Sequence, residues 1–270
     1  MKITSIIKYT LLTAMRDWLY LGIMVLVICS IFLSIFLGST AISEQGKMSI
    51  AYIGGSVRMI TIIGLILFVC FHVRRSFENK EIELVLTRPI SRVQFVLLYY
   101  AGFAFLAATL IIPIVAIMYL AVFNFQYVDF SQEELKIATD GMVLWSISFF
   151  FESLIVIAFS FFAALILESA VFAVLSTFSF YFISRVMGFF LVSIANPAST
   201  MHSSTLGYYA EKILHGIGML MPRLDMFSRS EWLIYGLSDV NQYLLFLGSS
   251  LIYISFIMSM ALFDFVRKQF

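Results

Sequence analysis

The chain has 270 residues, of which 61% are hydrophobic and 12% charged, and its formal net charge is +1. Soluble domains carry about a quarter charged residues, and no water-soluble core could bury this much apolar surface. A soluble fold is therefore excluded, and the near-neutral charge gives no reason to expect a nucleic-acid partner.

Six apolar stretches are long enough to cross a bilayer, which takes about 20 residues of helix. Lipid offers no partner for bare peptide groups, so a spanning segment is a helix or part of a closed barrel. Continuous apolar runs favour helices over the alternating pattern of barrel strands. We therefore expect an all-α membrane protein, with residues 1–270 forming one transmembrane domain and six spans over 18–38, 52–73, 94–123, 141–167, 170–195 and 241–264.

Residues 1–16 precede the first span and have an apolar helical stripe. Such a segment is typical of an amphipathic helix that lies along the membrane interface with its cations near anionic headgroups. An irregular basic tail is the alternative. The residues that share the apolar face are Ile3, Ile6, Ile7, Leu11 and Ala14.

The segment 74–92, between the second and third spans, is the most charged part of the chain. Good helix formers over 74–86 predict a helix, which Pro89 must interrupt because proline lacks an N–H and restricts the preceding residue. Ser91 followed by Gln94 has the pattern of a capping box and predicts the start of the third span. We expect a helix, a sharp break and a new helix.

Two further connections have a recognisable pattern. Glu168 and Ser169 are the only polar break between the fourth and fifth spans, which predicts a tight helical hairpin. The long segment 197–240 contains a stretch, 206–222, that is too polar to span easily and too apolar for a free loop. We expect an outer amphipathic or re-entrant helix there, stopped before Pro222.

The distribution of cations predicts the orientation. Loops rich in Lys and Arg stay in the cytoplasm, so both termini are expected there. The cations on the side of the termini are Lys2, Lys8, Arg16, Arg74, Arg75, Lys80, Arg88, Arg92, Arg267 and Lys268, against Lys47, Lys136, Lys212, Arg223 and Arg229 on the other. Cys29 and Cys70 both lie within spans and no CxxC is present, so neither a disulfide framework nor a metal site is expected.

Three ionisable residues, Arg58, Glu152 and Arg185, fall within predicted spans. Each costs a few kcal/mol if it faces lipid, so each is expected to face protein or water. Counting along the helices places all three in one layer, on the order of 10–16 Å below the outer boundary. One interpretation is structural, with Glu152 paired to one arginine while the other snorkels outward. The other is that the arginines line a translocation path for an amphiphilic or anionic substrate.

The charged segment also carries a family likeness. Residues 81–92, reading Glu-Ile-Glu-Leu-Val-Leu-Thr-Arg-Pro-Ile-Ser-Arg and followed by Phe95, resemble a motif of type-2 ATP-binding-cassette (ABC) exporter permeases, NosY-like ones especially. Residues 220–227 are similar to the segment before that family's last span, and 263–270 to its basic tail. Asn79 and Lys80 depart from the family, which commonly has Gly-Thr there.

This resemblance implies a transport subunit that is not itself an enzyme, in the inner membrane of a bacterium. Two such permease subunits, identical or different, would pair within the lipid around a translocation path. Separate cytoplasmic ABC ATPase subunits, which bind ATP and Mg, would dock beneath them, with the 168–169 turn as a minor contact. The coupling residues implied are Arg74, Arg75, Phe77, Glu78, Glu81, Glu83, Leu84, Arg88 and Pro89.

Two other classes of function remain as alternatives. A membrane-embedded lipid-modifying enzyme would need a cluster of carboxylates, histidines or a nucleophile and base near one interface, and the sequence has no obvious one. A stand-alone channel or secondary carrier would need no ATPase. The paired broken helices of many secondary carriers are not evident in these spans.

Overall fold

The computed structural model describes residues 4–40, 42, 45–79, 91–125, 132–195, 212, 216, 222–227, 231–236 and 240–267. Within these ranges all regular secondary structure is helical, with no strand. Six helices are long and apolar enough to cross a membrane. The prediction of an all-α membrane protein with several spans is confirmed.

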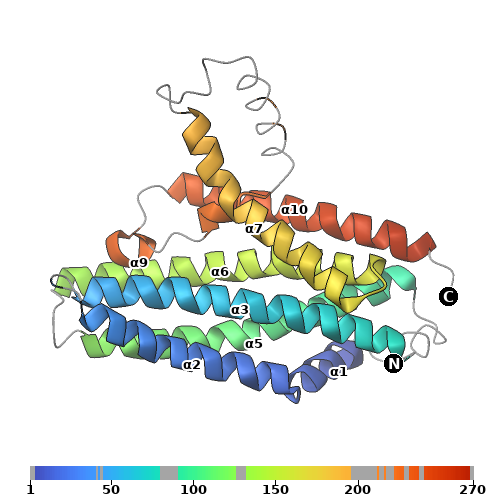
Figure 1. The fold of residues 1–270 in the computed structure, drawn as a ribbon, viewed down its shortest axis with the longest axis horizontal. Coiled ribbons are helices and arrows are strands. Elements are labelled where there is room, and N and C mark those ends of the chain that lie inside the picture. The colour runs from blue at the N-terminus through green and yellow to red at the C-terminus, as the bar shows by residue number, and fades with distance from the viewer. Residues whose placement is uncertain are drawn as a thin grey trace.

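The helices run side by side along one long axis, with α7 oblique to the others (Figure 1). α1 and the last turn of α10 lie at the same end, called here the α1 end; the other is the α9 end. The elements are α1 (Thr4–Met15), α2 (Trp18–Ser39), α3 (Gln45–Glu78), α5 (Arg92–Phe125), α6 (Gln132–Ile166), α7 (Ala170–Ala195), η2 (Leu224–Phe227), α9 (Glu231–Tyr235) and α10 (Val240–Arg267).

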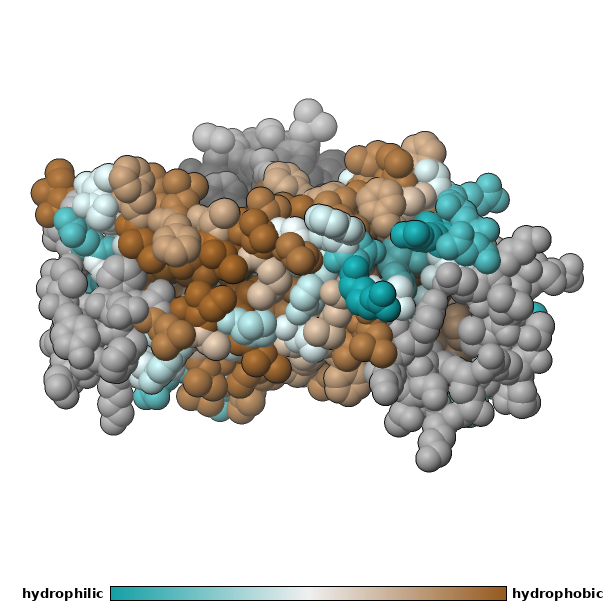
Figure 2. Space-filling model, turned by 90° about the horizontal axis from the view of Figure 1, so that it is seen from below, coloured by the Kyte–Doolittle hydropathy of each residue, from teal (hydrophilic) through white to brown (hydrophobic). Residues whose placement is uncertain are grey.

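α6 is the central helix and contacts α3, α5, α7, η2, α9 and α10. About two thirds of its most apolar window, 67%, is buried inside the bundle, against 22% for α10. α2 and α10 bury only 33% and 22% of their most apolar windows, and Figure 2 shows one broad hydrophobic face. Because lipid is as apolar as these side chains, such surfaces are typical of helices that face the bilayer.

The predicted spans agree with the helices except at the starts of the second and fourth spans; α6 begins at Gln132, where the sequence predicted a start at 141. α3 begins at Gln45, whereas the sequence predicted a start at 52. Residues 45–51 are more polar than the rest of the span, but Gly46 and Ser49 among them are buried. Gly38 of α2 lies so close to Ser49 that a Cβ at position 38 would be 1.9 Å from the serine Oγ. Small residues let the two backbones approach, so the helix continues where a loop was expected.

The helix predicted over 1–16 is confirmed as α1, which packs against α5. Thr10 and Ala14 are completely buried, and Thr10 lies directly against Gly102 of α5. α2 then begins at once, because the Asp17 carboxylate accepts a hydrogen bond from the backbone N–H of Leu19 at 3.1 Å. This is an ordinary N-cap and fixes the turn between α1 and α2.

Two local predictions at the α1 end are also confirmed. The Gln94 backbone N–H donates to the Ser91 hydroxyl at 3.2 Å, which is the N-cap expected at the start of α5. Only residues 167–169 separate α6 from α7, as the tight hairpin required. Residues 74–78 of the helix predicted over 74–86 form the end of α3. The rest of that helix, the break at Pro89 and most of the outer stretch 206–222 lie outside the described residues.

The close contact between α2 and α3 gives a stability prediction. Gly38→Ala should lower the free energy of unfolding by about 1–3 kcal/mol, because the added methyl group meets Ser49, including its backbone. The matched control is Gly22→Ala on the same helix, where nothing lies within 4 Å. Thermal unfolding in detergent would compare the two, and equal midpoints would contradict the close approach.

Candidate functional site

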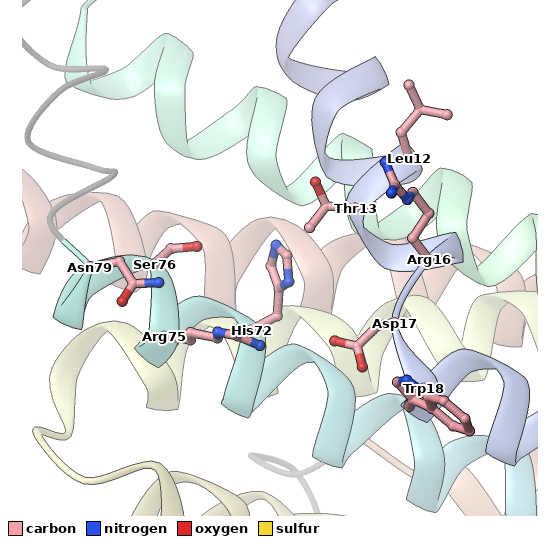
Figure 3. Close-up of a pocket in the computed structure, with 9 residues that line it drawn as sticks. All are labelled: Leu12, Thr13, Arg16, Asp17, Trp18, His72, Arg75, Ser76 and Asn79. Carbon is pink, nitrogen blue, oxygen red and sulfur yellow. The ribbon is translucent and has the colours of Figure 1, made fainter.

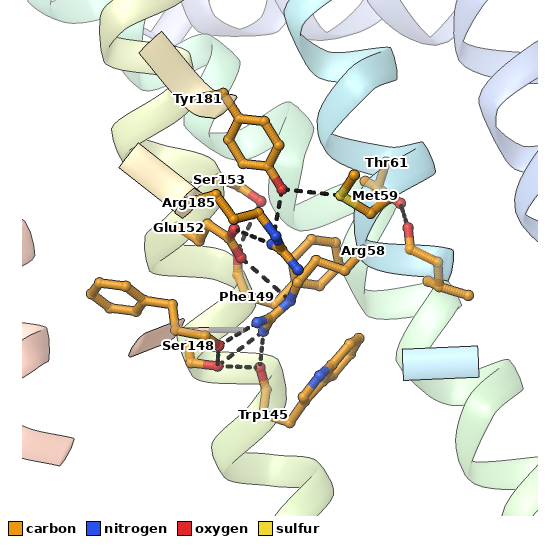
Figure 4. A network of polar contacts seen from close by, with 12 residues as sticks. Arg58, Met59, Thr61, Trp145, Ser148, Phe149, Glu152, Ser153, Tyr181 and Arg185 are labelled. Atoms are coloured by element: carbon orange, nitrogen blue, oxygen red, sulfur yellow. Dashed lines mark hydrogen bonds and ion pairs between the residues drawn. The ribbon is translucent and has the colours of Figure 1, made fainter. Parts of the chain in front are cut away.

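The three charged residues of the spans meet inside the bundle (Figure 4). Arg58 Nε lies 3.3 Å from Glu152 Oε2, and an Arg185 Nη lies 3.3 Å from Glu152 Oε1. α3, α6 and α7 each supply one of these residues. The expectation of a shared layer is confirmed, although Glu152 contacts both arginines rather than one.

Arg58 is the more enclosed of the two arginines, with 1% of its side chain exposed. Its guanidinium donates to the Trp145 carbonyl at 3.2 Å, to the Ser148 hydroxyl at 3.0 Å and to the Phe227 carbonyl. It also lies 4.8 Å from the ring centre of Trp145 and 5.2 Å from that of Phe149. A planar guanidinium suits this arrangement, because its five donors reach several acceptors while its faces stack on aromatic rings.

Arg185 occupies the more open side of the cluster, with 25% of its side chain exposed while Glu152 is completely buried. It donates to the Tyr181 hydroxyl at 3.0 Å, and that hydroxyl lies 3.4 Å from the Met59 sulfur. The three ionised side chains together carry one net positive charge. Arg185 is therefore the member that could meet a ligand, whereas Arg58 is sealed.

The segment before α9 closes the cluster from the side of the long outer connection. The Phe227 carbonyl at the end of η2 accepts hydrogen bonds from Arg58 and, at 3.1 Å, from Ser148. Asp225 of the same turn lies against α7, where its carboxylate occupies the space that a side chain at Gly188 would need. Arg223 pairs with this carboxylate at 3.2 Å. η2 is thus held by α3, α6 and α7 together.

Sequence reasoning missed the polar partners of this cluster. Trp145, Ser148 and Glu152 are spaced three and four residues apart, which puts them on one face of α6. Tyr181 and Arg185 are likewise one helical turn apart. That spacing was a usable signal. The contribution of the Phe227 carbonyl had no such signal, because every residue has a backbone carbonyl.

This arrangement suits holding helices together or contacting an anion. In the part of the chain that the structure describes, no three His, Cys, Asp or Glu side chains are grouped so that they could hold a metal ion. Removing one partner from a buried ion pair costs about 3–5 kcal/mol, because the remaining charge is left uncompensated in a medium of low dielectric constant. The cluster is therefore a strong constraint on how α3, α6 and α7 sit together.

The predicted coupling residues lie at the far end of α3. Arg74, Arg75, Phe77 and Glu78 occupy its last two turns, and the Arg74 guanidinium lies 5.5 Å from the Phe77 ring centre. The other predicted members are outside the described residues: Glu81, Glu83, Leu84, Arg88 and Pro89. α3 has no interruption between Arg58 and Arg75, so one helix joins the two places over about 25 Å.

The ion cluster predicts an order of stability among neutralising variants. Glu152→Gln should lower the free energy of unfolding by about 3–5 kcal/mol, because it leaves two cations without their counter-charge. Arg185→Gln should cost less, because the Arg58–Glu152 pair stays neutral and position 185 is partly exposed. Thermal unfolding of the purified chain would measure both.

Asp140→Asn provides the control, since Asp140 is exposed and lies on the same helix as Glu152. The structural role of the cluster is contradicted if the change at position 152 is no more harmful than the change at position 140.

Comparisons with known proteins add no assignment: no protein-family model and no curated protein sequence matches the chain. The structure itself identifies a multi-pass α-helical membrane protein. What it offers for function is a buried Arg–Glu–Arg cluster and a long helix that leads from this cluster to the charged α1 end.

Proposed function

We propose that this chain is the membrane-spanning permease subunit of an ATP-driven ABC exporter. It would lie in the inner membrane of a bacterium with both termini in the cytoplasm. It would pair with a second permease subunit and receive its energy from separate ATPase subunits that bind ATP and Mg. The observation that carries the proposal is the uninterrupted α3, which carries both residues of the proposed coupling segment and Arg58 of the buried ion cluster.

The charges at the α1 end support a protein contact there. Arg75 and Glu78 are exposed at the end of α3, directly before the segment that resembles the family motif. Exposed charges of both signs favour a specific orientation of a partner more than they add affinity. An ATPase surface bound at this end could move α3, which extends into the bundle as far as Arg58.

Movement of α3 would act on the cluster, because Arg58 is fixed to this helix while Glu152 belongs to α6. A shift of α3 along its axis would strain the contacts of Arg58 with α6 and with the Phe227 carbonyl. Packed helices change between discrete arrangements and do not deform continuously, so the bundle would switch as rigid bodies. Alternation between two such arrangements would open the path to one side at a time.

In this mechanism the two arginines have different roles. Arg58 and Glu152 hold helices together, since both are sealed from solvent. Arg185 is the candidate for the translocation path, since a quarter of its side chain is exposed. An arginine in that position favours an anionic or amphiphilic substrate, because the headgroup could replace part of its solvation.

Charge reversal at the end of α3 tests the coupling role. The chain would be co-purified with its ATPase and reconstituted in vesicles. Arg74→Glu together with Arg75→Glu should abolish most of the stimulation of ATP hydrolysis by the permease. An ATPase surface that is complementary to the two arginines would then meet charges of its own sign. Arg267→Glu is the control, since Arg267 is exposed at the same end on α10.

The outcome separates the proposed function from its alternatives. Unchanged stimulation in the doubly reversed variant would contradict coupling through this segment. A chain that transports solute or turns over lipid with no ATPase present would belong to one of the other classes, a carrier, a channel or a lipid-modifying enzyme.

A second test asks whether α3 moves relative to α7. The native Cys70 thiol of α3 lies 3.8 Å from the Thr177 hydroxyl of α7, so Thr177→Cys would place two thiols side by side. Bridging them with Hg²⁺ should stop ATP-driven transport, and a reducing thiol should restore it. Cys29→Ser in the same background removes the other cysteine. Full transport by the bridged protein would contradict relative movement of these helices.

A further inference from the structure

Two adjoining hollows lie at the α1 end, where the turn between α1 and α2 faces the last turns of α3. The first has a volume of about 540 Å³ and is lined by Arg16, Asp17, His72, Arg75 and Asn79 among others (Figure 3). The second, of about 510 Å³, shares four of these residues, all except Arg16. The two therefore form one depression, called here the α1–α3 groove.

The groove carries cations that no described residue neutralises. Among the residues that the structure describes, the guanidinium groups of Arg16 and Arg75 make no ion pair or hydrogen bond. Asp17 faces Arg75 across the first hollow in Figure 3, but its carboxylate caps α2 through the Leu19 N–H at 3.1 Å. With Arg74 and Glu78 from the second hollow, the groove has three arginines and two carboxylates. The charged side chains that line the groove therefore carry a net positive charge.

One rim of the groove continues into the lipid-facing surface. Trp18, the first residue of α2, is 87% exposed and lines the first hollow. Tryptophan is enriched at the level of the lipid headgroups, where its ring is half in water and half in apolar surroundings. From there Leu21, Val25 and Phe32 form an exposed apolar stripe along α2. Figure 2 shows the hydrophilic residues gathered toward one end of this hydrophobic face.

We propose that the α1–α3 groove binds the phosphate of an anionic phospholipid, whose acyl chains lie along the exposed stripe of α2. Guanidinium groups recognise phosphate oxygens through paired hydrogen bonds, and two unpaired arginines at one hollow supply them. Basic pockets between spanning helices are a physical match for anionic headgroups. A soluble phosphate shares this chemistry, but the stripe and Trp18 favour a ligand with an apolar part.

The lipid site does not depend on the proposed transport function, because it is defined without a partner chain. Arg74, Arg75 and Glu78 belong to both proposals, whereas Arg16 and Trp18 belong only to this one. An acidic surface of a protein partner is the competing occupant. It is less favoured because the groove opens toward the lipid-facing stripe.

Tryptophan fluorescence can test the site in the full chain. Of its three tryptophans, Trp145 and Trp232 are buried, so quenching by lipids brominated on the acyl chain reports mainly on Trp18. Trp18→Phe gives the background to subtract. The chain would be reconstituted in two mixtures of phosphatidylcholine and phosphatidylglycerol with the same fixed lipid ratio. Only the phosphatidylglycerol is brominated in the first mixture, and only the phosphatidylcholine in the second.

In the wild-type chain, brominated phosphatidylglycerol is expected to quench Trp18 more strongly than brominated phosphatidylcholine does. Arg16→Gln should reduce this preference about fivefold, the effect of one cation near an anionic surface. Arg267→Gln should leave it unchanged, since Arg267 is an exposed arginine at the same end but outside the groove. Arg16 is exposed, so its removal leaves no buried gap.

Several results would overturn the proposal. Equal quenching by both lipids in the wild-type chain would exclude an anionic-lipid site and leave the acidic protein surface as the occupant. An equal fall in Arg16→Gln and Arg267→Gln would show only general attraction to the membrane surface. Displacement by inorganic phosphate as effective as that by lipid would identify a soluble anion as the ligand. No ATPase is present, so each failure leaves the coupling proposal untouched.

Discussion

The buried guanidinium of Arg58 is the constraint around which the bundle is arranged. An arginine inside a membrane protein must find acceptors for its donors and a counter-charge, or the fold loses several kcal/mol. Here the acceptors come from α6 and from the turn η2, and the counter-charge is Glu152. Together they fix two neighbours of α3, namely α6 and η2. Arg185 then brings α7 to the same carboxylate.

This dependence explains why polar residues are found in the middle of so apolar a chain. Without a hydrophobic force between helices in lipid, packing alone distinguishes poorly between alternative registers of α3 on α6. An ion cluster with directional hydrogen bonds selects one register, because a slip by one residue would separate charge from counter-charge. The same property suits a transport subunit, in which two registers could serve as two states. That function remains our proposal, supported by the continuity of α3 and the likeness at its end.

The sequence predicted those parts of the fold that depend on composition and spacing along one helix. The six spans, the Ser91 cap and the common layer of Arg58, Glu152 and Arg185 all follow from hydropathy, turn chemistry and the rise of a helix. Contacts between elements distant in sequence could not be predicted in this way. The early start of α3 at Gln45 depends on its fit against α2, and the role of η2 depends on a backbone group.

The part played by the Phe227 carbonyl has a consequence for how the outer connection is recognised. A main-chain oxygen is the same whatever side chain it accompanies. Arg58 therefore depends on the position of the backbone at residue 227 and not on the identity of the side chain there. What the bundle demands of this stretch is a tight turn of the right size, with room for it beside Gly188. Connections of different sequence could therefore present the same carbonyl, provided that they bend alike and bury apolar side chains where Leu224, Met226 and Phe227 lie.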